Sequence, residues 1–249
     1  MSPTSPNEMK YAAGALSHME TTESRGDDRF AAALRGFGPI GLLAILAIGL
    51  TGNVFVGGFA FPLGGLLVLA WAARSRTPLR AIGYVTPKSW VVTIVVAAAL
   101  GVALKLVLKA VVMPLLGADP INATYHHLVG NAAALPAAIW SMFVGAGFGE
   151  ETVFRGFAFE RLRRLLGNSA WAKSLAVVVT SAAFGAAHFG TQGMSGVQQA
   201  TIVGLVFGTF VAIRGRIWPV IAAHIAFNLT ALTIIYFDLE SAVAHIVFK

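Results

Sequence analysis

The sequence contains no cysteine and few charged residues. Without cysteine, the chain can form no disulfide, no thiolate zinc site and no cysteine nucleophile. Charged residues make up only 12% of the 249 residues, about half of their share in a typical soluble domain. A soluble all-helical body built from this chain would lack the polar surface to cover itself. Any chemistry must therefore come from other side chains, in a protein that we do not expect to be soluble.

Hydrophobic residues dominate instead. They make up 57% of the chain and give a mean hydropathy of +0.75, so we expect the lipid bilayer to be the solvent. The net charge of +7 does not indicate a nucleic-acid partner, because the lysines and arginines form short clusters between apolar runs. Clusters of this kind are typical of the cytoplasmic loops of membrane proteins.

Apolar runs long enough to cross a bilayer begin after a polar segment at residues 1–35. A helix needs about 20 apolar residues to span the hydrocarbon core. The sequence therefore predicts an all-α fold, a polytopic transmembrane helix bundle with about seven spans, in one membrane domain at 36–249. The expected spans are 37–52, 54–73, 89–113, 135–158, 171–188, 197–213 and 217–237.

The basic clusters orient this bundle. They precede the first expected span and follow the second, fourth and sixth, whereas the loops around Asn53, at 117–135 and at 189–196 carry no lysine or arginine. Cytoplasmic loops are enriched in basic residues. We therefore expect residues 1–35 to be a cytoplasmic tail, the C-terminus to lie outside, and the protein to reside in the cell membrane. The clusters are Arg25, Arg29 and Arg35; Arg74, Arg76, Arg80 and Lys88; Arg161, Arg163, Arg164 and Lys173; and Arg214 and Arg216.

Two glutamates stand inside the fourth expected span, in the stretch EETVFR at 150–155. Charged groups in a span are expensive to bury and usually functional. Glu151 and Arg155 are four residues apart and share a helix face, so we expect Arg155 to neutralise Glu151. Glu150 points about 100° away on an α-helix. We expect it to face the bundle interior and to activate a water molecule as a base.

Polar residues also stand in the last expected span, in the stretch HIAFN. His224 and Asn228 are four residues apart, so their donors project from one helix face. Two donors that converge on one oxygen are what an oxyanion hole requires. We therefore expect these two side chains to bind a developing negative charge.

The stretch FGAAH supplies His188 as a second catalytic group, with Phe184 one turn earlier as a packing residue. Helices rise about 1.5 Å per residue, which places Glu150, His188 and His224 at depths of roughly 16, 22 and 12 Å from the nearest basic residues. The three side chains can therefore meet near the middle of the membrane, in a buried catalytic site.

The three stretches together resemble the motifs of a known family. EETVFR, FGAAH and HIAFN match the EExxxR, FxxxH and HxxxN motifs of the CPBP (Abi) intramembrane proteases, in order and without departure. This family includes the type II CAAX prenyl endopeptidases and bacteriocin-processing enzymes, and the match runs from about 134 to 232. The resemblance implies a glutamate-dependent intramembrane endopeptidase.

The resemblance also implies a role for each motif residue. Glu150 and His188 would activate a water molecule, and His224 and Asn228 would stabilise the tetrahedral oxyanion. From the residues themselves we expect Glu151, Arg155 and Phe184 to support the site. The expected partners are a membrane protein or peptide substrate, prenylated CAAX tails being one class within the family, and the lipid bilayer.

We expect no cofactor, but zinc is the alternative. Glu150, His188 and His224 are chemically plausible zinc ligands, although the sequence contains no HExxH stretch. The groups present can activate water without a Lewis acid.

Three alternative functions also fit parts of the sequence. The stretch GMSG at 193–196 resembles the GxSG of rhomboid proteases, which would make Ser195 a nucleophile in an outer loop. A non-catalytic immunity or scaffold protein would keep the fold and bind partners. A transporter would use buried Glu and His as proton relays. The complete motif set favours catalysis.

Overall fold

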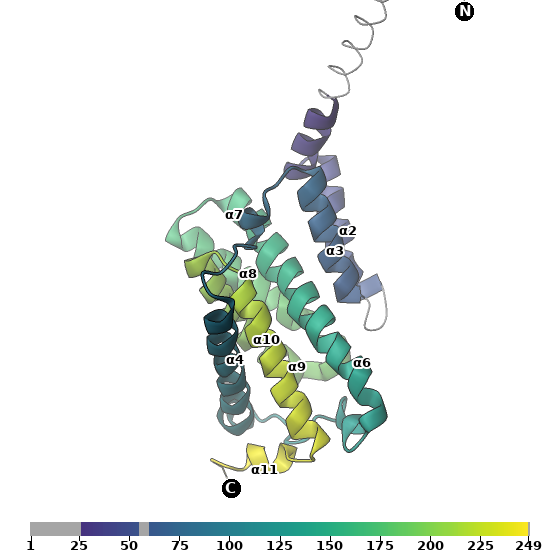
Figure 1. The fold of residues 1–249 in the computed structure, drawn as a ribbon, viewed down its shortest axis with the longest axis vertical. Helices are drawn as coiled ribbons and strands as arrows, with labels where there is room; N and C mark the ends of the chain where they lie inside the picture. The colour runs from purple at the N-terminus through teal and green to yellow at the C-terminus, as the bar shows by residue number, and fades with distance from the viewer. Residues whose placement is uncertain (1–25, 55–59, 249) are drawn as a thin grey trace, which may run out of the picture.

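The computed structural model describes residues 26–54 and 60–248, in which every regular element is a helix (Figure 1). The predicted all-α fold is therefore confirmed. The α-helices are α2 (Pro39–Val54), α3 (Ala60–Arg74), α4 (Trp90–Val107), α5 (Met113–Leu115), α6 (Leu135–Trp140), α7 (Phe159–Leu166), α8 (Ala170–Ala187), α9 (Phe189–Arg214), α10 (Trp218–Tyr236) and α11 (Glu240–Ala244). The π-helical segments are η2 (Leu108–Val112), η5 (Ser141–Glu150) and η6 (Thr152–Ala158), and the 3₁₀ segments are η1 (Leu79–Ile82), η3 (His126–Leu128) and η4 (Ala132–Ala134).

Five of the described helices are long and apolar enough to cross a membrane, so the chain is a multi-pass membrane protein. A sixth span results if the bent pair Gly26–Arg35 and Pro39–Thr51 counts as one, whereas Phe61–Arg74 is shorter. Each of the seven expected spans contains helix. The five long helices are Trp90–Leu115, Ala132–Leu166, Ala170–Ala187, Phe189–Arg214 and Trp218–Tyr236.

The N-terminal helices α2 and α3 lie side by side and join the main bundle through α3 (Figure 1). On α3, Val68 and Trp71 are buried against Val153 and Phe157 of η6. Residues 26–35, which the sequence assigned to the polar tail, form a helix that bends by 56° from α2. The rest of the predicted tail lies outside the described residues.

The chain passes from α8 to α9 without the outer loop predicted at 189–196. That prediction is wrong, because α9 already begins at Phe189 and only bends at Gly193, whose φ is 60° and ψ −158°. Glycine adopts this conformation without the steric cost of a Cβ. His188 is the C-cap residue of α8 and lies where the chain turns into α9.

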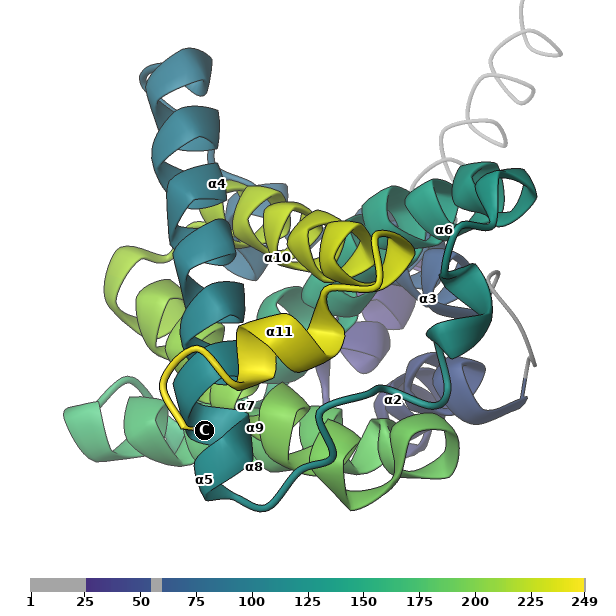
Figure 2. The same ribbon diagram turned by 90° about the horizontal axis from the view of Figure 1, so that it is seen from below.

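Helices α4 and α10 cross in close contact, and both views show them adjacent (Figures 1 and 2). A Cβ on Gly101 of α4 would collide with the Ala223 carbonyl and reach within 3.0 Å of the Phe227 nitrogen. Small residues allow such close approach between membrane helices. The backbone of α10 on either side of His224 is therefore held directly against α4.

Candidate active site

Glu150 and Glu151 lie where two π-helical segments meet. Segment η5 ends at Glu150 and η6 begins at Thr152. π-helical turns are rare and occur frequently at functional sites. The two carboxylates are not kept apart as their α-helical spacing predicts, because both approach the same histidine, His224.

Two of the three glycines before the glutamates bring neighbouring helices close. A Cβ on Gly147 would meet Ile225 of α10, and one on Gly149 would collide with the backbone of Phe61 on α3. Gly145 approaches no neighbouring helix, because the nearest atom to its Cβ position belongs to Ser141 of its own segment. The glutamate segment is thus fixed between α3 and α10.

Glu151 is fully buried and contacts both Arg155 and His224. Its Oε1 lies 3.0 Å from Arg155 Nη1, which is the predicted ion pair, and 2.7 Å from His224 Nδ1. The second contact joins η5 and η6 to α10. Because a carboxylate accepts hydrogen bonds, His224 donates through Nδ1 and only its Nε2 remains for other partners.

Arg155 packs over an aromatic ring. Its Cζ lies 4.1 Å from the ring centroid of Phe184, a cation–π contact between two almost fully buried side chains. The Phe184 ring also meets His188 edge-on at 4.7 Å and lies 6.1 Å from His224. Phe184 therefore packs against Arg155 and His188 and approaches His224.

Glu150 lines a cavity of about 910 Å³ inside the bundle. Its side chain is largely buried, and its Oε2 lies 3.8 Å from His224 Nε2. His188, His224 and Asn228 line the same cavity. The four side chains therefore line one cavity, and Glu150 faces it whereas Glu151 is turned into the ion-pair cluster.

His188 has a defined tautomer when it is neutral. Its Nδ1 lies 2.8 Å from the backbone carbonyl oxygen of Phe184, and a carbonyl can only accept. Nδ1 therefore carries the proton, which leaves Nε2 with a lone pair. A neutral His188 can accept a proton through Nε2.

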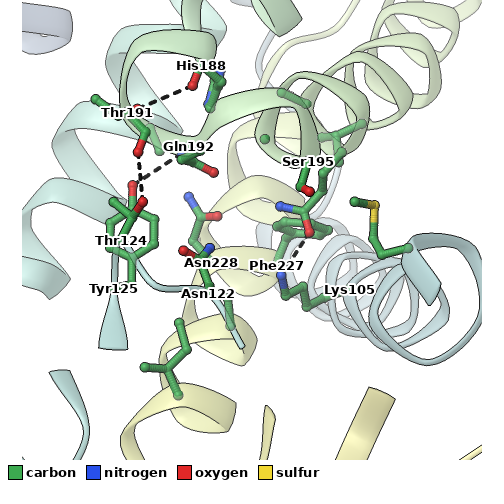
Figure 3. Close-up of a pocket in the computed structure, with 18 of the residues that line it drawn as sticks. Lys105, Asn122, Thr124, Tyr125, His188, Thr191, Gln192, Ser195, Phe227 and Asn228 are labelled. Carbon is green, nitrogen blue, oxygen red and sulfur yellow. Dashed lines mark hydrogen bonds between the residues drawn. The ribbon is translucent and has the colours of Figure 1, made fainter. Parts of the chain in front are cut away.

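Asn228, which Figure 3 shows on the cavity wall, follows His224 by one turn of α10, and both line the cavity. An amide can donate two hydrogen bonds and cannot act as a base. Because His224 and Asn228 both line the cavity, the helix face that they share is directed at it.

Tyr125 and Gln192 close part of this cavity, and sequence reasoning missed both. The amide nitrogen of Gln192 donates to the Tyr125 hydroxyl at 3.2 Å, and Thr124 Oγ1 donates to the Thr191 carbonyl at 2.7 Å (Figure 3). Burial, and then the charge of Glu150, raise the pKa of Tyr125. Its hydroxyl therefore stays protonated. A tyrosine between two predicted spans gave no sequence signal for this position.

Two lysines of the α4 span also reach the cavity. Lys105 donates to Gln199 Oε1 at 3.0 Å, and Lys109 lies 3.0 Å from Glu240 Oε1. Sequence reasoning missed them, although a signal existed. Two lysines spaced i, i+4 within an apolar run meet the same criterion that singled out Glu150.

Ser195 lies on α9 beyond the bend and lines the cavity, so its predicted place in an outer loop is wrong (Figure 3). The two histidines that would serve it as base use their Nδ1 atoms elsewhere, His188 on a carbonyl and His224 on Glu151. The rhomboid-like reading gains no support from these contacts.

The zinc alternative does not fit the arrangement of the side chains. Across residues 26–54 and 60–248, no three His, Cys, Asp or Glu side chains are grouped so that they could hold a metal ion. Glu150, His188 and His224 share the cavity without converging on one point. We therefore derive no step through a metal.

Comparison with known families adds one finding. Residues 132–230 match the family described as type II CAAX prenyl endopeptidase Rce1-like. No curated protein and no solved structure matches the chain. The matched segment runs from η4 into α10 and includes all three motifs.

Proposed function

Because residues 132–230 match the Rce1-like type II CAAX prenyl endopeptidase family, which is a family of peptidases, we propose that the chain is an intramembrane endopeptidase. It would hydrolyse peptide bonds of membrane-associated proteins or peptides. One observation carries the proposal: four polar side chains from three separate motifs line one cavity within membrane-spanning helices. They are Glu150, His188, His224 and Asn228.

In this proposal Glu150 and His188 activate the water. Glu150 takes a proton from a water molecule whose oxygen attacks the carbonyl carbon of the scissile bond, and the proton is later delivered to the leaving amine. His188 assists through Nε2, the nitrogen left free by its bond to the Phe184 carbonyl. The position of Glu150 on the cavity wall supports its role as the base.

His224 and Asn228 then stabilise the oxyanion. His224 must donate through Nε2, because its Nδ1 proton is used on Glu151, and this requires the imidazolium form. Glu150, Glu151 and Arg155 together leave one negative charge, which a protonated His224 balances. The electrostatic surroundings therefore suit an imidazolium donor.

Glu151, Arg155 and Phe184 act as positioning residues. Glu151 sets the direction of the His224 ring, and Arg155 compensates its charge at 3.0 Å. The ring of Phe184 packs against the guanidinium of Arg155, and the backbone carbonyl of Phe184 accepts a hydrogen bond from His188. None of the three needs to touch the substrate.

We also propose one membrane domain at 36–249 after a cytoplasmic tail at 1–35, with the basic clusters in the cytoplasm. The chain has no cysteine, so single introduced cysteines report their own location. We expect Asn168→Cys to react with an impermeant maleimide only from the cytoplasmic side and Ala123→Cys only from outside. The opposite labelling pattern would reverse the orientation.

Cleavage itself tests the function. The purified protein, reconstituted in liposomes, is incubated with a synthetic peptide ending in a farnesylated C-a-a-X sequence, and with the same peptide lacking the farnesyl group. We expect mass spectrometry to detect a shortened peptide with the farnesylated substrate. Intact peptide throughout, with folded protein, argues against a CAAX substrate, and cleavage of both peptides argues against prenyl selectivity.

The oxyanion role of Asn228 gives a separate prediction. Asn228→Ala should lower kcat by roughly 10²- to 10³-fold, as loss of one oxyanion donor does, while KM and the melting temperature stay near wild type. Steady-state kinetics on the cleavable peptide measure this. A raised KM at unchanged kcat would assign Asn228 to substrate binding, and a lowered melting temperature with unchanged kinetics would leave it with an interhelical hydrogen bond, worth only about 0.6 kcal/mol.

A further inference from the structure

Lys105 is a buried lysine in a membrane span without an acidic partner. It is 8% exposed, and its Nζ donates to the neutral Gln199 amide oxygen at 3.0 Å. Its Nζ also lies 5.1 Å from the ring centroid of Phe227. Among the described residues no carboxylate pairs with it. A positive charge in this environment is costly to keep unless something compensates it.

Lys109, one turn further along the same span, provides the contrast. It is similarly buried, but it forms an ion pair with Glu240 at 3.0 Å and donates to the Pro120 carbonyl. Its charge is therefore compensated within the protein. The two lysines line one cavity. They differ in that Lys109 is paired with a carboxylate, whereas the acceptor of Lys105 among the described residues is a neutral amide oxygen.

The packing of α4 on α10 explains where Lys105 points. Gly101 lies one turn before it and lets α4 touch the backbone of Ala223 and Phe227. Lys105 is therefore set beside Phe227, the residue that precedes Asn228 on the cavity wall. In Figure 3 the dashed line from Lys105 marks its bond to the Gln199 amide. The ammonium group thus lies in the same cavity as the catalytic candidates.

We propose that Lys105 binds the free C-terminal carboxylate of the peptide substrate. This inference rests on the proposed endopeptidase function, and it adds a specificity residue outside the matched family segment. An ammonium group and a carboxylate form a charge-assisted hydrogen bond, which is about twice as strong as a neutral one. Because Gln199 accepts from Lys105 through Oε1, its own NH₂ group is free to donate to a second carboxylate oxygen.

The position of this subsite defines which bond is cut. A chain end held at Lys105 places the scissile bond between that end and the rest of the substrate, at Glu150, which lines the same cavity. Hydrolysis then releases a short C-terminal peptide that carries the carboxylate. The enzyme would therefore select chain ends and reject internal segments of a membrane protein.

Two synthetic peptides test the inference. Both end in the same farnesylated C-a-a-X sequence, one with a free carboxylate and one with a C-terminal amide. We expect wild type to prefer the carboxylate roughly ten- to a hundredfold in kcat/KM, the range for a hydrogen bond to a charged group. Lys105→Met removes the charge with little change in volume, and we expect the ratio to fall to about one.

A charge-neutral control separates the proposed contact from the general charge of the cavity. Lys109→Met combined with Glu240→Gln removes a lysine whose charge is already paired, so we expect the wild-type ratio to persist. A ratio near one in wild type would overturn the inference. So would an unchanged ratio in Lys105→Met, or an equal loss in the control.

Binding to a Glu150→Gln variant keeps the two proposals distinguishable. Competition with a fluorescent peptide gives the Kd of both peptides without turnover, and we expect the same carboxylate preference and the same loss on adding Lys105→Met. If wild type cuts neither peptide but this preference exists, the endopeptidase proposal fails while the carboxylate subsite stands. If cleavage occurs without any preference in binding or turnover, only the subsite fails.

Discussion

Glu150→Gln should abolish peptide cleavage and leave the protein folded. The substitution keeps the size of the side chain and removes the group that accepts the proton of the attacking water. A positioned base contributes roughly 10²- to 10⁴-fold, and we expect a loss at the upper end because Glu150 is the carboxylate on the cavity wall. Turnover of the farnesylated peptide in liposomes measures the effect.

The stability of this variant distinguishes chemistry from architecture. Glu150 lies 3.8 Å from His224 and forms no other ion pair within the described residues. We therefore expect its melting temperature in detergent to change much less than that of Arg155→Ala. Retained cleavage by a folded Glu150→Gln protein would exclude Glu150 as the base.

The proximity of Glu150 and His224 was predictable because it depends on depth and helix rise. The number of residues between each basic cluster and each motif fixes how far a side chain lies from the membrane face. That count placed Glu150 and His224 at similar depths, and they lie 3.8 Å apart. The Glu151–Arg155 pair followed from the i, i+4 rule in the same way.

The directions of the side chains were not predictable, because they depend on helix irregularities. The π-helical segments around Glu150 turn both carboxylates towards His224, which α-helical spacing would separate. The bend at Gly193 replaces an expected loop, because a single positive φ is enough to redirect the chain. No periodicity in the sequence signals either feature.

The cavity wall outside the motifs was missed for another reason. Lys105 and Tyr125 come from segments before the motif region, and their approach to it depends on the close crossing at Gly101 and on the Gln192 contact. These contacts join segments that are far apart in the chain, and the sequence alone does not show which helices lie next to each other. Only the rarity of lysine in a span pointed to Lys105.

Arg155→Ala should have the largest effect on stability. The substitution removes the ion pair with Arg155, so among the described residues the fully buried Glu151 keeps only its hydrogen bond with His224. Removing one member of a buried ion pair costs about 3–5 kcal/mol, because the other charge stays uncompensated. The loss of the cation–π contact with Phe184 adds to this cost. We expect a large fall in the unfolding free energy, measured by reversible denaturation in mixed detergent micelles.

The control is a pair of neutral substitutions that keep the volume of both side chains. Glu151→Gln alone should also destabilise, because it strands the guanidinium of Arg155. Glu151→Gln combined with Arg155→Met should be less destabilised than the sum of the single variants, because no buried charge is left unpaired. Activity should nevertheless fall in the double variant, since an amide can still accept from His224 Nδ1 but no longer favours the imidazolium that donates to the oxyanion. If Arg155→Ala melts like wild type while Glu150→Gln is destabilised, the roles of the two carboxylates are exchanged, and Glu151 becomes the candidate base.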